Sequence, residues 1–520
     1  MRRWAACVGV AMLAACSSRP PVVRPRMSAA DRLAAVDAEV RAGCLDCLVG
    51  AYRRFDELRA EPDAADAATA GAIRAAALIA LRQRELGMVD EGYLEKARAL
   101  ATQPTVPRWL PTILDIIDAL PGNGAGTGGP PRSDLDLQRM QRLRTNRGAW
   151  LALLRDSSRY DEAAAYTLLS LGCDSIDTRN TPREELFANV DAFAGAPLIV
   201  YRESLCRQIE SGTLKPLLEK DPRFVEITFA LGAELQGARP RPKLDEAEEQ
   251  YQRAYAWHPQ WPALTLTMAG VAMTAEDFAR ARTLYDETLT YDPHSGNALL
   301  GLVKAQTYLG KYEEGIATAD RLLEEHWYIG DARYWRAYDE FQLARYDAAW
   351  DDVELAEKSS INAQIPKLAG LIAYQRHQPE TAITRFKTSL ERNPFDCETR
   401  FYRGVIHAEQ AQWTDTVDVL SSAATCLENH EAELKGEIEQ IRGSDLREDR
   451  KAKQIARREQ EIAEGRRRMA TSWYDCAVGY FSLKKSDEAR QFAEKVADDE
   501  QFGARAKEIL SRISRDNDLR

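Results

Sequence analysis

The chain has six histidines, the side chains best suited to acid–base or metal chemistry, and they are scattered along it. None forms a His-Glu-x-x-His metal site or stands beside an evident nucleophile. The sequence also lacks a Gly-Lys-Ser/Thr phosphate loop and a Gly-x-Ser-x-Gly nucleophile elbow. The pattern Gly124-x-Gly126-x-x-Gly129 has dinucleotide-binding spacing, but no strand pattern precedes it and two prolines follow it. We therefore predict that the protein is not an enzyme and holds no metal or cofactor.

Composition places the chain among globular proteins. It has 520 residues, with 70 Lys and Arg against 81 Asp and Glu, so its formal charge is −11. An apolar content of 45% excludes a disordered chain. Because phosphate contacts need clustered cations, the acidic balance predicts no nucleic-acid partner.

The first sixteen residues have the order of an export signal. Arg2 and Arg3 precede an uncharged run, residues 4–15, which is too short to span a membrane. The run ends in Leu13-Ala14-Ala15-Cys16, which resembles the bacterial lipobox. A cleaved signal with a chance cysteine is the alternative.

The lipobox resemblance implies a cellular location for the mature protein. Residues 1–15 are then a signal peptide, Cys16 is the lipidated first residue, and residues 16–27 form a proline-containing tether. The residue after the cysteine is Ser17 and not Asp. In lipoproteins of the Gram-negative type this implies a periplasm-facing anchor in the outer membrane.

The remaining cysteines suggest cross-links. Nine cysteines less Cys7 and Cys16 leave seven, so at least one has no partner within the monomer. An exported compartment permits disulfides. Cys44-Leu-Asp-Cys47 lacks the features of a haem or redox site, and predicts a local bridge or two packed thiols. Cys397 and Cys426 fall at the two ends of one predicted helical hairpin, where Cα atoms come within roughly 4.4–6.8 Å, so this pair is the best disulfide candidate.

A pattern of small, aromatic, small and proline residues recurs along the second half of the chain. Two copies are thirty-four residues apart. Clear copies start at Ala247, Ala281 and Ala382, and weaker ones centre on Gly315, Ala349, Thr416 and Ala489. The pattern resembles the tetratricopeptide repeat, in which small residues let paired helices approach and the proline stops the second helix. This resemblance covers about residues 222–515 and implies an all-α fold, an α-α superhelix.

The preceding residues carry the same hairpin pattern in degenerate form. Leu86-Gly87 followed by Tyr93 and Ala97 is one example. We expect TPR-like helical hairpins over residues 28–120 and 134–220. Between them, residues 121–133 contain five glycines and three prolines, which predicts a linker.

A charged insertion, residues 429–470, separates repeats at 222–428 from a last repeat at 471–515. Residues 431–445 carry five acidic and two basic side chains, whereas residues 447–468 carry nine basic and five acidic ones. Opposite net charge predicts two extended antiparallel helices. We expect a solvated helical spur; contact of the basic arm with anionic lipid or nucleic acid is the alternative.

The repeat resemblance also implies a concave groove that binds a partner. Mapping the family's groove-facing positions onto this chain gives Asn297, Lys304, Tyr308, Tyr334, Tyr338, Phe341, Lys367, Tyr374 and Phe401. Tyr and Phe offer large contact area at low entropic cost, which suits a peptide or partner helix. A register error of one residue would make some of them core residues.

Two functions are compatible with these features. The first is an outer-membrane lipoprotein scaffold that holds a protein or peptide partner during cell-envelope assembly or secretion. The second is a lipoprotein that captures glycans or nutrients by stacking sugars on aromatic rings such as Trp327 and Trp335. An elongated aromatic stripe would favour a peptide, and a compact platform a sugar.

Overall fold

The computed structural model describes most of the chain, namely residues 27–103, 106–107, 109–120, 134–158, 161–173, 187–193, 195–207, 211–238 and 242–518. The predicted signal peptide, Cys16, the tether up to residue 26 and the linker at 121–133 lie outside the described residues. Within these ranges the chain forms helices and no strand, which confirms the all-α fold class. No helix in this part of the chain combines the length and the apolar character that a membrane span requires.

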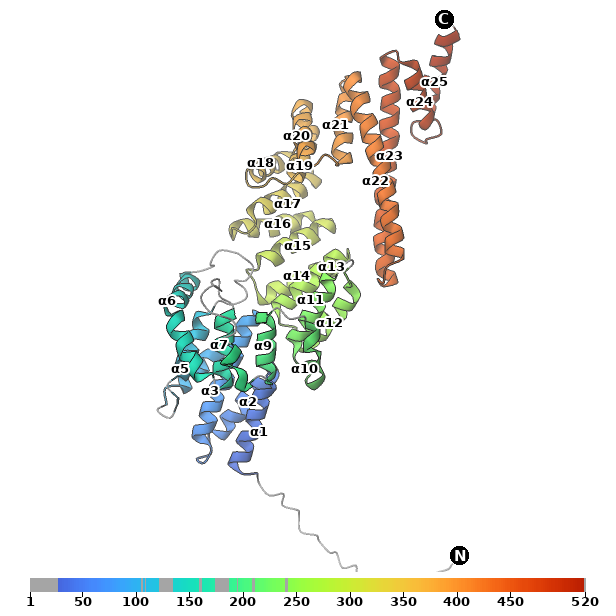
Figure 1. Ribbon diagram of the computed structural model, residues 1–520. Coiled ribbons are helices and arrows are strands. Elements are labelled where there is room, and N and C mark those ends of the chain that lie inside the picture. Colours follow the sequence, from blue (N-terminus) through green and yellow to red (C-terminus); the bar gives the residue numbers. More distant parts are fainter. Residues whose placement is uncertain are drawn as a thin grey trace, which may run out of the picture.

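From residue 225 onward, consecutive helices pair into antiparallel hairpins that stack in chain order (Figure 1). The first helices are α11 (Val225–Gly237), α13 (Pro262–Thr274), α15 (Gly296–Tyr308), α17 (Ile329–Gln342), α19 (Gln364–Gln375), α21 (Cys397–Glu409) and α23 (Glu448–Ser482). Their partners are α12 (Leu244–Trp257), α14 (Phe278–Tyr291), α16 (Tyr312–Glu324), α18 (Tyr346–Glu357), α20 (Pro379–Arg392), α22 (Trp413–Arg442) and α24 (Ser486–Lys495), and α25 (Gly503–Asp518) covers the last pair. The superhelix expected from the sequence is therefore present.

The small residues of the repeat pattern lie where the paired helices touch. All of the pattern's alanines, and Thr416, are fully buried on the second helices. Facing helices carry glycines for the same reason. A Cβ on Gly370 would lie 2.4 Å from the Phe386 ring, and one on Gly404 would lie 2.4 Å from Leu420. Close approach of the two helices thus requires these small side chains.

The turns inside the hairpins from α13–α14 onward repeat one backbone conformation. Glu276, Gly310 and Ala344 are thirty-four residues apart, and each has a positive φ, at 60°, 70° and 58°. Ala411 and Lys484 occupy the same turn in later hairpins, with φ of 53° and 60°. The thirty-four-residue spacing is therefore a structural repeat, although a glycine, which adopts this conformation without strain, occupies only one of these five turns.

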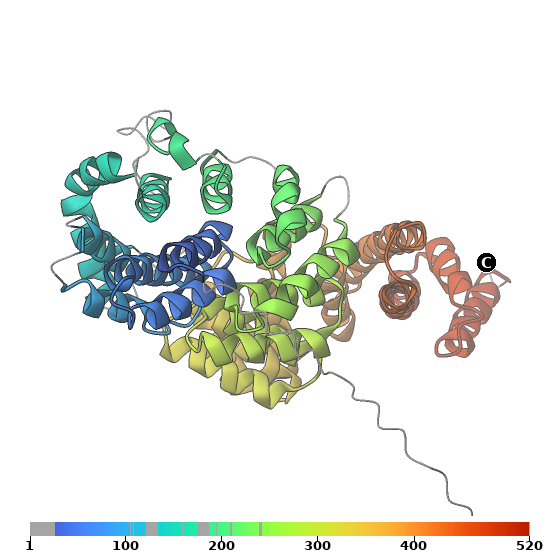
Figure 2. The same ribbon diagram turned by 90° about the horizontal axis from the view of Figure 1, so that it is seen from below.

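The N-terminal helices form a second region, blue to green in Figures 1 and 2, which continues into the repeats. Its helices are α1 (Ala29–Ala42), α2 (Leu45–Leu58), α3 (Ala65–Leu86), α4 (Tyr93–Leu100), α5 (Leu110–Ala119), α6 (Asp134–Ser157), α7 (Glu162–Cys173), α9 (Pro197–Arg207) and α10 (Lys215–Lys220). One apolar core runs without a break from Val36 to Ala305. The N-terminal helices and the first repeats are thus packed as a continuous body.

The charged insertion forms the ends of α22 and α23, which extend beyond the other hairpins and pack against each other (Figure 1). The bases of both helices belong to the repeats, since Leu420 of α22 and Cys476 of α23 share a core. Further out, Leu434, Ile438 and Ile462 form a small core within the extension itself. We call residues 429–470 the charged hairpin.

Two disulfides lie at positions that the sequence singled out. Cys397 and Cys426 are bonded, with their Cα atoms 5.4 Å apart, and link the start of α21 to α22. Cys44 and Cys47 are bonded at the start of α2, and both are buried. Cys476 is a buried free cysteine, and burial raises the pKa of its thiol to about 12. A thiol with so high a pKa is a core side chain and a poor nucleophile.

Candidate functional site

Five aromatic rings from three successive repeats meet on one side of the superhelix. Phe278 begins α14 and stacks on Tyr308 of α15, with ring centroids 4.6 Å apart. Trp335 of α17 is 6.0 Å from Tyr308 and is flanked on its own helix by Tyr334 at 5.3 Å and Tyr338 at 6.1 Å. We call these five residues the aromatic stripe. Tyr308 is 48% exposed, so the stripe offers contact surface to a partner.

The hydroxyl groups of Tyr334 and Tyr338 stay neutral over the physiological range. Burial raises the pKa of Tyr334, and the neighbouring hydroxyls of Tyr338 and Tyr308 raise it further. Burial also raises the pKa of Tyr338, with smaller contributions from Tyr312 and from Glu398 of α21. A neutral phenol both donates and accepts hydrogen bonds, which suits recognition of a peptide backbone or a hydroxyl group.

The charged hairpin lies beside this stripe. The Arg457 guanidinium of α23 is 5.7 Å from the ring centroid of Phe278 and 5.7 Å from that of Tyr308. Arg457 and Arg458 also pair with Glu276, in the turn before α14, at 3.4 and 3.2 Å. A helix far along the chain therefore forms one edge of the aromatic surface.

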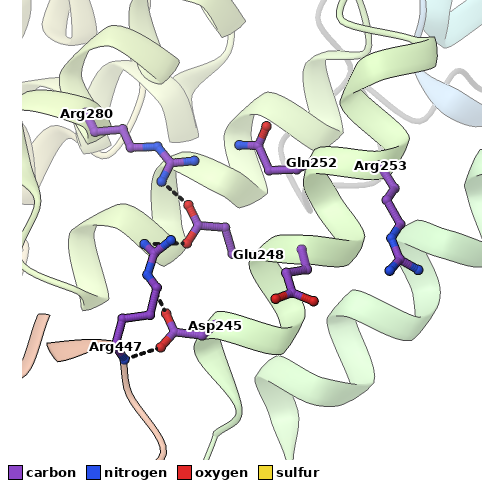
Figure 3. Close-up of a pocket in the computed structure, with 7 residues that line it drawn as sticks. Asp245, Glu248, Gln252, Arg253, Arg280 and Arg447 are labelled. Atoms are coloured by element: carbon purple, nitrogen blue, oxygen red, sulfur yellow. Dashed lines mark hydrogen bonds and ion pairs between the residues drawn. The ribbon is translucent and has the colours of Figure 1, made fainter. Parts of the chain in front are cut away.

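The tip of the charged hairpin docks on α12, as Figure 3 shows. The backbone N–H of Arg447 donates to Asp245 at 2.6 Å, and its guanidinium lies 3.2 Å from Glu248. Arg450 donates to Asp245 at 2.6 Å and also contacts Glu248, which in turn pairs with Arg280 of α14. Asp245, Glu248, Arg280 and Arg447 line an open cavity of about 460 Å³. The expected solvated spur is thus wrong in one respect: the tip is held by ion pairs to a helix about 200 residues earlier.

The base of the charged hairpin makes a third charged contact. Arg468 of α23 donates to Glu398 of α21 at 2.6 Å, and the same carboxylate lies 2.8 Å from the Lys367 ammonium of α19. Helix α23 thus contacts the repeats at α12, at the turn before α14 and at α21. It spans the repeats that carry the aromatic stripe (Figure 1).

Comparison with known proteins places this geometry in a family. Residues 272–338, which include most of the aromatic stripe's helices, match the family model of the tetratricopeptide repeat. This stretch of the chain carries the tetratricopeptide repeat. No curated protein sequence matches it significantly.

Solved structures of other TPR proteins resemble parts of the chain at low identity. YrrB, titled "a TPR protein with an unusual peptide-binding site", is 16% identical, with 36% of this chain and 97% of that one covered and a TM-score of 0.30. MamA from Desulfovibrio magneticus RS-1 is 15% identical, with 33% and 96% covered and a TM-score of 0.29. The APC/C hetero-tetramer Cut9-Hcn1 is 12% identical, with 94% and 90% covered and a TM-score of 0.39. These scores are low, so the assignment depends on the family match and on the hairpin geometry.

The structure brings part of the predicted TPR groove set together. Tyr308, Tyr334 and Tyr338 lie in the stripe, and the Lys304 ammonium is 5.9 Å from the Trp335 ring. Phe341, near the C-terminal end of α17, is not part of the stripe and packs against Tyr346, with ring centroids 5.8 Å apart. Three of the nine predicted residues therefore belong to the stripe, and Lys304 lies beside it.

Other members of the predicted set contact the chain itself. Asn297 accepts a hydrogen bond from Tyr328 at 2.5 Å, and Lys367 pairs with Asp396 at 3.1 Å as well as with Glu398. Tyr374 donates to Glu409 at 2.6 Å; burial and this hydrogen bond raise the pKa of Tyr374 to about 12. These polar groups are already satisfied, so they offer less to a partner than the stripe does.

Phe401 is a core residue and not a groove contact. Its side chain is 8% exposed and packs with Leu420 and Ala423 of α22. The physical reason is local packing, because Phe401 lies on a face of α21 that packs against α22. Groove mapping by repeat position does not detect such a change.

Sequence reasoning missed Phe278, which belongs to the aromatic stripe, and Arg457, which lies beside it. Phe278 begins a second helix, which the family's groove pattern does not count. Arg457 comes from the charged hairpin, and its approach to Tyr308 depends on how that hairpin folds back. A weak signal existed, since acidic residues of α12 and basic residues of α23 are complementary in charge.

Proposed function

We propose that this chain is a membrane-anchored lipoprotein scaffold whose TPR superhelix holds a protein or peptide partner at the aromatic stripe. The coarser statement is established: the chain is a helical-repeat protein of a kind that generally acts as a non-catalytic scaffold for protein interactions. The observation that carries the finer one is the stripe itself, five rings over three successive repeats with Tyr308 half exposed.

The origin of the rings in three successive repeats favours a peptide over a sugar. A peptide segment or helix presents side chains at intervals along a line, which matches rings contributed by α14, α15 and α17. Large aromatic groups in partly desolvated positions dominate the binding energy of many interfaces. Glycan capture remains the second candidate, and it is one outcome of the test below.

The address of the protein is part of the proposal. Arg2, Arg3 and the Leu13-Ala14-Ala15-Cys16 segment support export and lipidation, and Ser17 supports the outer membrane, facing the periplasm. A lipid-anchored scaffold in that position suits envelope assembly or secretion. Substitution of Cys16 by Ser should abolish metabolic labelling with an alkyne fatty acid and release the chain from the membrane fraction. Unchanged labelling would contradict the anchor.

The partner-binding proposal is tested by affinity capture of the detergent-solubilised protein after in-cell cross-linking. We expect Tyr308→Ala combined with Tyr338→Ala to lose one protein partner. The matched control is Phe395→Ala, because Phe395 is 86% exposed but lies in the α20–α21 loop, outside the stripe. Retention of every protein partner, with loss of oligosaccharide binding instead, would overturn the proposal in favour of glycan capture.

A further inference from the structure

A second cavity, remote from the aromatic stripe in sequence, lies where the N-terminal helices meet the first repeats. Its volume is about 570 Å³, and its lining comes from the end of α3, from α9, from α11 and from the start of α13. One face of α11 supplies half of that lining. The small side chains of Ala230 and Ala233 on this face leave the space open.

Aromatic rings form the walls of this cavity. Phe229 and Trp261 lie with their ring centroids 4.8 Å apart and their planes tilted by 49°, and Tyr201 lines the cavity from α9. Trp261 is 3% exposed and Tyr201 is 8% exposed, so the rings are fixed by packing. Ring faces carry partial negative charge and attract organic cations.

The polar groups of the lining are carboxylates. Glu85, Glu226 and Glu234 line the cavity, and among the described residues no Lys or Arg does. Glu85 is already satisfied, because it accepts hydrogen bonds from Arg82, Tyr166 and Ser170 at 2.9, 2.5 and 2.9 Å. Although burial alone would raise the pKa of Glu85, Arg202 and Arg82 hold it below its ordinary value.

Glu226 differs from Glu85 in having a spare oxygen. Its Oε1 pairs with Arg82, whereas its Oε2 has no hydrogen-bond partner among the described residues, although the side chain is only 2% exposed. The indole N–H of Trp261 is likewise buried without a partner in this part of the chain. A buried polar atom without a partner costs about 1–3 kcal/mol. A ligand that binds these atoms would recover that cost.

We propose that this cavity binds a primary ammonium group carried on a short apolar stem. The ammonium would donate to Glu226 Oε2, and the stem would lie against the Phe229 and Trp261 rings, which line the cavity. An anion would meet three carboxylates and no cationic side chain. A purely apolar ligand would leave Glu226 Oε2 unsatisfied. The same chemistry belongs to a free alkylamine and to a lysine side chain. The proposal does not depend on the function of the aromatic stripe.

The test uses ligand-observed NMR titration of the full mature chain in detergent. The probes are n-butylammonium chloride and Nα-acetyl-lysine N-methylamide, with butan-1-ol and sodium butyrate as uncharged and anionic controls at constant ionic strength. We expect saturable binding of at least one ammonium probe, about tenfold or more tighter than either control. Tighter binding of the capped lysine indicates a protein side chain as the source, and tighter binding of butylammonium indicates a free amine.

Two variants separate binding from folding. Ala233→Leu fills the cavity from an exposed position without touching the buried ion pairs, and we expect it to weaken ammonium binding about tenfold or more with unchanged circular dichroism. Glu226→Gln removes the acceptor charge, but it also weakens the pair with Arg82 and serves as the second variant. Equal binding of butan-1-ol, no saturable binding of either ammonium probe, or an unchanged affinity in Ala233→Leu would overturn the proposal.

Discussion

Charged side chains hold the repeats at two junctions, and the two junctions differ in burial. At the N-terminal junction, Arg82 and Glu226 pair with side chains that are 1% and 2% exposed, inside an apolar core. At the hairpin tip, Arg450 is buried at 6% exposure, whereas Arg447, which pairs with the same two acids, is 54% exposed. The first junction is a polar cluster inside the protein, and the second is a partly solvated contact.

This difference has an energetic consequence. Removing one member of a buried pair leaves an uncompensated charge in a low-dielectric interior, which costs far more than the pair contributes when intact. Solvated pairs gain little and are screened by salt. The N-terminal junction should therefore be rigid and insensitive to salt, whereas the charged hairpin should dock and release with ionic strength.

The largest effect is expected at Arg82. Arg82→Met should destabilise the protein by about 3–5 kcal/mol, because Glu226 and Glu85 lose their common cation. The denaturation midpoint in urea measures this. The double variant Arg82→Met with Glu226→Gln should lose less than the sum of the single variants. Strict additivity would show that the two side chains do not act as a pair.

A buried carboxyl group without a cation sharpens the comparison. Asp339 of α17 is fully buried, and this burial raises the pKa of Asp339 to about 7 although a hydrogen bond from Thr307 opposes the shift. The folded state then holds a proton that the unfolded state has already released. Stability contributed by this proton is complete below about pH 4 and is lost as the pH rises through 7.

We therefore expect Asp339→Asn to stabilise the protein at pH 8 by about 1–3 kcal/mol and to flatten the dependence of the melting temperature on pH between about 4 and 7. The matched control is Asp352→Asn, since Asp352 is also buried but pairs with Arg336 at 2.5 Å. That control should be destabilised. An unchanged pH profile in Asp339→Asn would show that Asp339 does not hold the proton.

Substitutions at the tip of the charged hairpin should change stability less than Arg82→Met does, and docking of the tip should weaken as the salt concentration rises. Combined Arg447→Ala and Arg450→Ala should speed amide hydrogen exchange in residues 445–452 while global unfolding shifts by about 1–2 kcal/mol at most. Raising NaCl from about 50 mM to about 500 mM should also speed amide hydrogen exchange in these residues of the unmodified protein. Arg512→Ala, which removes an exposed pair within α25, is the control and should change neither. If the protection of these amides from exchange changes neither with salt nor with the substitutions, the tip is not docked by electrostatic contacts.

The smallest effect is expected from a backbone change that involves no charge. Ala411→Gly should stabilise the α21–α22 turn by up to about 1 kcal/mol, because Ala411 has a φ of 53°. Gly310→Ala in the equivalent turn of the α15–α16 hairpin, with a φ of 70°, should destabilise it by a similar amount. Thermal melts of both variants check this, and equal signs would contradict a shared turn conformation.

Local pattern predicted the helical hairpins because their signals lie within one repeat. The small residues at Ala281 and Ala382 and the prolines that follow them report on contacts a few residues away, and the structure buries both alanines completely. The paired cysteines at 397 and 426 could be placed for the same reason, since both belong to one hairpin.

Contacts between distant segments could not be predicted in the same way. The docking of Arg450 on Asp245 spans about 200 residues, and surface acids and bases are too common for charge alone to identify the pair. Phe401 shows the limit of positional mapping, because its repeat position predicts a groove residue whereas it is buried against α22. The pairing of Arg82 with Glu226 could not be predicted either, because in the sequence both look like ordinary surface charges of a helix.

The central claim is that the aromatic stripe is the surface that holds a partner. The most direct measurement is photo-cross-linking in the native cell with p-benzoylphenylalanine in place of Tyr308, compared with the same group in place of Phe395. We predict a discrete protein adduct from position 308 and none from position 395. Identical adducts from both positions, or no protein adduct at 308, would contradict the account.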